Sequence, residues 1–301
     1  MTKSPTRPLR TAAAALVAAL SLGSCGTFSS SSEAFRVNWV SFSRDELNEL
    51  TSDLVKVGQI PGSNGTVGAK DLAGITSTMI QYTAGKEMLE TYGVKISPSD
   101  ISAARAQLGQ SDLSGLSEKT VNLLSEFSAM GKAFDSIKSP ADIADRYAAS
   151  PSSTGVLCIS EITVASEAEA RDALDRIAAG ETFAKVASAV TLDKEYRATG
   201  GNVEDVNGTS CFGLSSMLPK LGQAVLGALA RTAPGTPTPP TKDDTGWHIA
   251  VHRPWSEISA DHAKVLADRT GRQLLAGFLA VADVRVGSLY GTWNPVLAQV
   301  E

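Results

Sequence analysis

The sequence predicts an α+β protein in which a mixed segment of strands and helices is inserted between two helical segments. Apolar side chains recur at helical spacing within residues 43–147 and again within residues 263–282. The middle segment instead begins and ends with β-branched strands; its expected elements are strands over 156–164 and 245–252 and helices over 166–180, 182–190 and 219–229. Two strands that enclose three helices indicate one α+β unit.

The first residues have the pattern of an export signal. Three cations, Lys3, Arg7 and Arg10, precede an apolar run over residues 11–22. This run is too short to span a bilayer as a helix, so we expect residues 1–24 to be a cleaved signal peptide.

The end of this signal, Leu22-Gly-Ser-Cys25, resembles the lipobox of bacterial lipoproteins. The resemblance implies that Cys25 is lipidated and becomes the first residue of the mature chain. A plain secretory signal with a chance cysteine is the alternative. Residues 25–34 are rich in Gly and Ser, so we expect a flexible tether there. A lipid anchor implies an extracytoplasmic protein on the bacterial cell membrane, where disulfides persist.

The charge balance excludes nucleic acid as an expected partner. The full chain has 27 basic and 32 acidic side chains, and loss of the three cations of residues 1–24 leaves a net charge of −8. No basic patch with interleaved aromatic residues is present in the sequence. Residues 25–301 are long enough for two ordinary domains.

Two cysteines remain when Cys25 is assigned to the lipid. An even pair in an oxidising compartment favours a disulfide between Cys158 and Cys211, and two separate thiols are the alternative. Such a bridge closes a loop of about 50 residues and is worth roughly 4 kcal/mol in the chain-entropy model. Neither cysteine belongs to a metal-spacing motif, so we expect no metal site.

The flanking segments are predicted to be mainly helical. Residues 35–42 alternate like a strand, and Ser43-Arg-Asp-Glu46 is a capping box that begins a helix. Further helices are expected over 72–92, 100–108, 121–134 and 140–147, with a linker over 148–154, one long helix over 263–282 and an extended tail over 284–293. The simplest arrangement packs residues 256–301 against the N-terminal helices.

Four stretches of the middle segment occur in a recognisable order: ISEITVASEAEARDALDRIAAGETFAKVASAVTLD, TGGNV, CFGLSSMLPKL and DDTGWHI. Residues 155–254 thereby resemble a parvulin-type peptidyl-prolyl isomerase (rotamase) domain. The flanks, with VNWVSFSRDELNEL and GKEMLETYGVKISPSDI, resemble by pattern the chaperone part of SurA- and PrsA-type foldases. The resemblance implies a helical SurA-like chaperone domain, built from residues 35–150 and 256–301, with a parvulin-like domain inserted.

The chemistry of this family needs few groups. Rotation about an X–Pro bond has a barrier near 20 kcal/mol, and twisting the amide reduces its resonance. An apolar pocket for the proline ring and a few desolvated polar groups lower this barrier, with no nucleophile, metal or cofactor. The resemblance implies two histidines, an Asp or Cys, and a Met-x-x-x-Phe pocket.

Three residues carry over as candidate catalytic groups. His248 matches the second histidine, Asp193 matches the Asp or Cys, and Glu161 stands where the family has its first histidine. A carboxylate at that position, near Asp193, is expected to disturb the protonation of the pair. The alternatives are a structural role for His248, a turn cap at Asp193 and a structural salt bridge at Glu161.

The candidate substrate-binding residues are Met217, Leu221, Val203 and Thr245. Met217 matches the pocket methionine and Val203 a wall residue, while Thr245, with Asp243, borders the site. Leu221 replaces the usual phenylalanine and offers less surface to a proline ring. The remaining histidines, His252 and His262, are expected at the surface, and the four tryptophans are expected to anchor packing.

We therefore predict a membrane-anchored extracytoplasmic foldase with chaperone character, whose isomerase activity is weak or absent. Its expected partners are unfolded or nascent secreted polypeptides and, through the lipid, the membrane; no cofactor is expected. A non-catalytic chaperone and a protein-binding scaffold lipoprotein are the alternatives. Glu161 and Leu221 favour the non-catalytic chaperone, whereas Asp193, Met217 and His248 favour the enzyme.

Overall fold

The computed structural model describes residues 27–28, 32–63, 66–109, 115–205 and 208–301. The helices are α1 Arg44–Lys56, α2 Ala69–Thr91, α3 Pro98–Leu108, α4 Glu118–Asp135, α5 Ile143–Ala149, the 3-10 helix η1 Pro151–Thr154, α6 Glu167–Ala178, α7 Phe183–Val190, α8 Lys194–Ala198, α9 Leu214–Leu229, α10 Trp255–Asp268 and α11 Thr270–Val281. Helices and strands are both extensive, and the predicted α+β class is confirmed.

Two sheets organise the strands. One has the order β1-β11-β2-β3 and the other the order β7-β10-β9. Their strands are β1 Thr27–Phe28, β2 Glu33–Val37, β3 Val40–Ser43, β7 Ile159–Val164, β9 Thr241–Lys242, β10 Trp247–His252 and β11 Val284–Gly287. Short pairs join β4 Gly62–Ser63 to β5 Thr66–Val67, β6 Val156–Leu157 to β8 Phe212–Gly213, and β12 Trp293–Asn294 to β13 Gln299–Val300.

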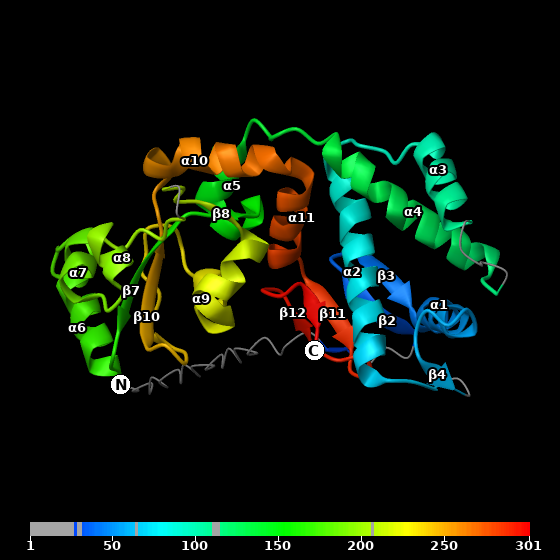
Figure 1. Ribbon diagram of the computed structural model, residues 1–301, viewed down its shortest axis with the longest axis horizontal. Helices are drawn as coiled ribbons and strands as arrows, with labels where there is room; N and C mark the ends of the chain where they lie inside the picture. Colours follow the sequence, from blue (N-terminus) through cyan, green and yellow to red (C-terminus); the bar gives the residue numbers. More distant parts are fainter. Residues whose placement is uncertain (1–26, 29–31, 64–65, 110–114, 206–207) are drawn as a thin grey trace, which may run out of the picture.

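The elements gather into two lobes (Figure 1). One lobe holds β7, β10 and helices α6 to α9, whereas the other holds α1 to α4 together with β2, β3 and β11. The second lobe combines both ends of the chain, because β11 pairs antiparallel with β2. One hydrophobic cluster accordingly joins Phe35 and Met79 to Leu274 and Val286.

The sheet β7-β10-β9 lies between two helical layers. Ile162 and Ile249 pack with α6 and α7, whereas Ile159 and Ala250 pack with α9. Because neighbouring side chains of a strand point to opposite faces, the two faces bury two separate clusters. The capping box expected at Ser166 begins α6, and the one expected at Ser43 begins α1.

The single long helix expected over 263–282 is wrong. The chain forms two helices, α10 and α11, that meet at Arg269, which has a non-helical φ of −149°. Helix α10 packs on α5 and β6, while α11 packs on α2, α4 and η1. A Cβ on Gly277 would lie 2.3 Å from the Ser153 carbonyl oxygen, so α11 approaches η1 closely. The helix therefore breaks at Arg269, because α10 and α11 pack against different elements although the apolar pattern of the sequence is continuous.

Two other local expectations are corrected. The expected linker 148–154 contains η1, whose Pro151 and Thr154 are buried against α11. The expected tether 25–34 ends in β2, where Ala34 is fully buried because it belongs to the hydrophobic cluster, and Thr27–Phe28 pairs with the open edge of β11. The whole of the expected signal peptide, residues 1–24, and Cys25 lie outside the described residues.

Helix α9 begins at Leu214, five residues before the expected start at Pro219. It contains Gly222 in a left-handed conformation with a φ of 69°, where glycine is favoured. Within the described ranges, no helix has the length and apolar character needed to cross a membrane.

Cys158 and Cys211 form a disulfide, as the cysteine count predicted. Cys158 lies between β6 and β7, and Cys211 immediately precedes β8. The two cysteines are 53 positions apart in the sequence, and their bridge reinforces the pairing of β6 with β8. It also lies at the end of β10 that holds His252, since the Arg253 amide donates to the Cys158 carbonyl.

Candidate functional site

The register of β7 and β10 brings Glu161 and His248 together. The strands are antiparallel, with Thr163 opposite His248 and Glu161 opposite Ala250. Glu161 is thus a diagonal neighbour of His248 on one face of the sheet, within reach of its imidazole. Both side chains are buried, with 2% of Glu161 and 5% of His248 exposed.

Each nitrogen of the His248 ring has a carboxylate partner. Nδ1 lies 2.5 Å from Glu161 Oε1, and Nε2 lies 2.8 Å from Asp243 Oδ1. Thr245 connects to the same group, with its Oγ1 3.0 Å from Nε2 and 2.7 Å from Asp243 Oδ1. The turn before β10 fixes Asp243, whose Oδ1 also accepts from the amides of Thr245 and Gly246.

These contacts determine how many protons the Glu161–His248–Asp243 network holds. An ionised carboxylate only accepts hydrogen bonds, so a proton must lie between Oε1 and Nδ1 and another on Nε2. The first proton belongs to the pair rather than to either residue. The network carries one net negative charge whichever group of the pair holds it.

The pKa shifts agree with a retained proton. Burial is the largest influence on Glu161 and raises the pKa of its carboxyl group. Burial alone would lower the pKa of His248, but hydrogen bonds and charge interactions with Glu161 and Asp243 raise it. Burial opposes ionisation of Asp243 as well, yet the hydrogen bonds from Thr245 and His248 lower its pKa. A carboxylate at position 161 therefore strengthens the hold of this site on a proton.

The double glycine, Gly200-Gly201, lies along the edge of β7 that is not paired with β10. The Glu161 amide donates to the Gly201 carbonyl over 2.7 Å, and the Val203 amide donates to Ile159 over 3.2 Å. Gly201 has a φ of +89°, and a Cβ there would lie 2.8 Å from the Glu161 carbonyl oxygen. Glycine at this position is therefore required by both conformation and space.

The candidate pocket residues lie on the same face of the sheet as His248. Met217, Leu221 and Val203 belong to one cluster with Ile159 and Ala250, which share that face with Glu161 and His248. They are 0%, 1% and 0% exposed, because apolar residues of β8 and α9 surround them. The expectation of an open apolar cleft beside the imidazole is therefore not met, and a proline ring needs these side chains to move.

Asp193 is not a hydrogen-bond partner of His248. Its exposed side chain caps α8, where Oδ1 accepts from the amides of Glu195 and Tyr196 over 2.8 and 3.0 Å. Burial is the largest influence that raises the pKa of both Glu161 and Tyr196, and the charge of Asp193 adds to it. Asp243, which was expected only to border the site, is the aspartate beside the imidazole. The spacing Asp-x-Thr-Gly-x-His from Asp243 to His248 was the available signal.

The expectation of surface positions for His252 and His262 is wrong. They are 1% and 0% exposed, and burial lowers the pKa of each to about 4. His252 Nε2 contacts the Leu229 carbonyl oxygen, because His252 shares the inward face of β10 with His248. His262 lies against the rings of Tyr147 and Trp255 in the packing of α10.

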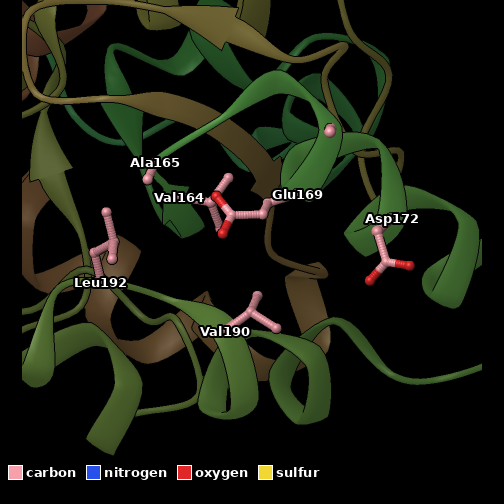
Figure 2. A pocket seen from close by; sticks show the side chains of 7 residues that line it. Val164, Ala165, Glu169, Asp172, Val190 and Leu192 are labelled. Atoms are coloured by element: carbon pink, nitrogen blue, oxygen red, sulfur yellow. The ribbon is translucent and has the colours of Figure 1, made fainter.

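A separate cavity of about 510 Å³ lies beside α6 and α7 (Figure 2). Val164, Val190 and Leu192 line it together with the carboxylates of Glu169 and Asp172. Val164 packs with α6 and α7, so this cavity is distinct from the His248 face of the sheet. Among the residues that the structure describes, no group of three His, Cys, Asp or Glu side chains is placed to hold a metal ion.

The α+β domain thus places a protonated imidazole network beside an apolar cluster on one face of its sheet. Such a site can bind an amide away from water. The family model for the rotamase, or PPIC-type PPIase, domain matches residues 158–252. This segment is therefore a parvulin-type peptidyl-prolyl isomerase domain. The match covers β7 to β10 and includes all the candidate catalytic and substrate-binding residues.

Solved structures with similarity to the chain include NmPin, the parvuline of Nitrosopumilus maritimus, at 22% identity over 33% of this chain and 96% of that chain, with a TM-score of 0.27. PrsA from Bacillus subtilis is 18% identical over 79% of this chain and 86% of that chain, with a TM-score of 0.30. A SurA-like chaperone structure from Campylobacter jejuni is 18% identical over 79% of this chain and 92% of that chain, with a TM-score of 0.26. No curated protein sequence matches the chain.

Proposed function

We propose that this protein is an extracytoplasmic foldase, held on the bacterial cell membrane by a lipid on Cys25, that assists the folding of secreted polypeptides. Its parvulin-type domain spans residues 155–254, and residues 35–150 and 256–301 together form the chaperone domain. The family match of residues 158–252 supports the isomerase part. The lipobox-like sequence before Cys25 supports the anchor.

One observation carries the enzymatic part of the proposal: the Glu161–His248–Asp243 network lies on the sheet face that also packs against Met217. Isomerisation forms and breaks no covalent bond, so the site needs only to hold the ring and stabilise a twisted amide. The proline ring contacts the Met217 cluster, and the amide takes the place of Asp243 Oδ1 as the acceptor of the His248 Nε2–H, with the Thr245 hydroxyl beside it. His248 is 5% exposed, so its N–H acts where water is largely excluded, which strengthens its interaction with the twisted amide.

The same geometry explains why we expect slow turnover. Met217, Val203 and Leu221 are completely covered, so part of the binding energy is spent on opening their cluster. Leu221 also presents less surface than an aromatic ring. We therefore propose an isomerase that accelerates X–Pro exchange modestly and combines this activity with binding of unfolded chains.

An NMR exchange measurement on short X–Pro peptides tests the isomerase with residues 26–301. The expected result is faster cis–trans exchange than in the uncatalysed peptide, with a loss of most of this acceleration in Met217→Ala. Met88→Ala is the matched control, because Met88 is equally buried but lies in the helical lobe. Absence of acceleration in the wild type, or equal acceleration in Met217→Ala, contradicts the proposal.

Exposed apolar side chains on the other lobe favour the chaperone part. Trp39 is 92% exposed at the turn between β2 and β3, where the sequence analysis expected a packing anchor, because the strand expected over 35–42 is instead a hairpin. Val40 beside it is 45% exposed. The Asn38 amide donates to the Asp283 carbonyl, which brings this turn to the end of α11, where Val281 is 52% exposed. Apolar surface of this kind on a soluble lobe is typical of an interaction site.

Suppression of aggregation of an unfolded client tests this part. We expect Trp39→Ser/Val40→Ser to reduce the suppression several-fold without changing X–Pro exchange. Leu192→Ser is the control, since Leu192 is 51% exposed on the parvulin-type domain. An unchanged suppression by the double variant contradicts the assignment of this surface to clients. Membrane fractionation of Cys25→Ser tests the anchor, and retention of this variant in the membrane fraction contradicts it.

A further inference from the structure

A cavity of about 440 Å³ lies beside the parvulin-type site and has no assigned ligand. It is open to solvent between α8, the segment after the double glycine and α9. Its lining consists of Glu195, Tyr196, Thr199, Asn202, Glu204, Asp205 and Lys220. We call it the acidic cleft, because three of its four charged side chains are carboxylates.

Two residues connect the acidic cleft to the site. Tyr196 lines the cleft and also packs against the cluster of Met217 and Val203. Asn202 lies between Gly201 and Val203, and the Ser160 hydroxyl donates to its Oδ1 over 2.8 Å. The acidic cleft therefore adjoins, through Tyr196, the apolar cluster that is proposed to receive the proline ring.

Two of the carboxylates of the cleft, Glu195 and Glu204, form no ion pair within the part of the chain that the structure describes. The cation of the lining, Lys220, lies over the Phe212 ring at 4.9 Å from its centroid.

Further negative charge faces the cleft from the site. The exposed carboxylate of Asp193 belongs to the cap of α8, next to Glu195. The Glu161–His248–Asp243 network contributes one net negative charge on its other side. Arg197, the cation on α8 nearest to Tyr196, has its guanidinium bound to the Thr191 carbonyl. Five negative charges, those of Asp193, Glu195, Glu204, Asp205 and the network, stand against the three cations Lys194, Arg197 and Lys220, so the net charge around the cleft is negative.

We propose that the acidic cleft is a specificity subsite that selects proline segments with a flanking Lys or Arg. This inference rests on the proposed function of the neighbouring site and names its substrate class. The basic side chain lies along Tyr196 with its aliphatic part, and its charged end lies between Glu195 and Glu204. A segment with Asp or Glu in the same place is repelled.

The size of the effect follows from solvent-exposed ion pairs. Each such pair contributes up to about fivefold in affinity, so two carboxylates give roughly tenfold between a Lys-flanked and a Glu-flanked peptide at low salt. The pairs are exposed, so the ratio is expected to fall toward one in about 1 M NaCl, where the Debye length is about 3 Å.

Fluorescence anisotropy of three labelled peptides tests the proposal. The peptides have equal length and one proline, flanked by Lys, Gln or Glu, and they are titrated with residues 26–301. The expected order of affinity is Lys above Gln above Glu. In Glu195→Gln/Glu204→Gln, the Lys-to-Glu ratio is expected to fall from roughly tenfold to about twofold. The control, Asp135→Asn/Asp145→Asn, makes the same change of charge on exposed positions of α4 and α5 and is expected to keep the ratio.

The outcomes separate this inference from the proposed function. Equal affinity for the three peptides, or an equal fall of the ratio in the control variant, overturns the specificity subsite and leaves the isomerase site intact. Failure of all three peptides to bind overturns the proposed peptide site itself, and the subsite with it. A ratio that persists in 1 M NaCl also contradicts the proposed ion pairs.

Discussion

The two ends of β10 hold histidines on the same face of one sheet, yet their surroundings give these residues opposite behaviour. His248 lies between Glu161 and Asp243, which raise its pKa. His252 contacts a backbone carbonyl and apolar side chains, and burial lowers its pKa to about 4. Equal burial therefore does not determine the charge of an imidazole. Here the charge of the imidazole is determined by whether a carboxylate occupies the neighbouring position on the paired strand.

The two ends are also held together by different means. At the His252 end, the Cys158–Cys211 disulfide joins the start of β7 to β8. At the His248 end, the double glycine and the hydrogen-bonded network hold the strands. We therefore expect the disulfide at the His252 end to contribute most to stability, whereas the network at the His248 end supplies the polar groups of the candidate site.

The largest expected effect is at the His252 end. Cys158→Ala/Cys211→Ala removes the constraint on a loop of 53 residues and is expected to lower the free energy of unfolding by about 4 kcal/mol. Urea denaturation of the wild type and the variant measures the difference. An unchanged unfolding midpoint means that the disulfide does not stabilise this end.

Acid is expected to weaken the His252 end. The native pKa of about 4 is below the unfolded value near 6.5, so the native state binds fewer protons and stability falls as pH decreases from 6.5 to 4. The full loss from His252 is about 3 kcal/mol. His252→Gln keeps a donor for the Leu229 carbonyl and is expected to lose less stability over this range. Equal pH slopes for variant and wild type, measured by urea denaturation, contradict the assignment.

Acid is expected to act in the opposite direction on His248. Its native pKa is raised, so its contribution to stability is present below the unfolded value and is lost as pH rises through the native value. Glu161→Ala leaves the buried Nδ1 without its partner and is expected to cost about 2 kcal/mol at pH 6. Glu161→Gln is the control that keeps the side-chain volume. Unchanged stability in Glu161→Ala contradicts this expectation, and unchanged stability in Glu161→Gln relative to the wild type shows that the buried charge contributes little.

The smallest expected effect separates space from conformation at the double glycine. Gly201 has a positive φ, and a Cβ there lies 2.8 Å from the Glu161 carbonyl oxygen, whereas Gly180 has a positive φ and nothing within 4 Å of a Cβ. Both Gly→Ala variants cost about 1 kcal/mol for the backbone, and Gly201→Ala is expected to cost about 1 kcal/mol more. Equal unfolding midpoints for the two variants in urea mean that the backbone at Glu161 shifts to accommodate the added Cβ without a further loss of stability.

Much of the fold and part of the site could be predicted from local sequence signals. The capping boxes at Ser43 and Ser166 begin helices because they need only residues three positions apart. The pair of cysteines indicated the disulfide for a similar reason, since few partners were available. The break at Arg269 gave no such signal, because it depends on the direction in which α10 and α11 pack.

The contacts of the site depended on register rather than on spacing. Asp193 was favoured because it matches the Asp or Cys of the family, but its carboxylate caps α8, and Asp243 contacts His248. The burial of His252 follows from the alternation His248, Ala250, His252 along one strand, a signal that was present in the sequence and was not used. Closure of the Met217 cluster depends on packing between β8, α9 and β10, which a single sequence does not specify.

The pH titration of the three histidine rings by NMR, with and without an X–Pro peptide, tests the central claim most directly. The account predicts a pKa above 6.5 for His248 and a change of only its ring signals when the peptide binds, while His252 and His262 titrate near 4. A His248 that titrates at or below 6.5, or that does not respond to the peptide, would show that the network is not a peptide site.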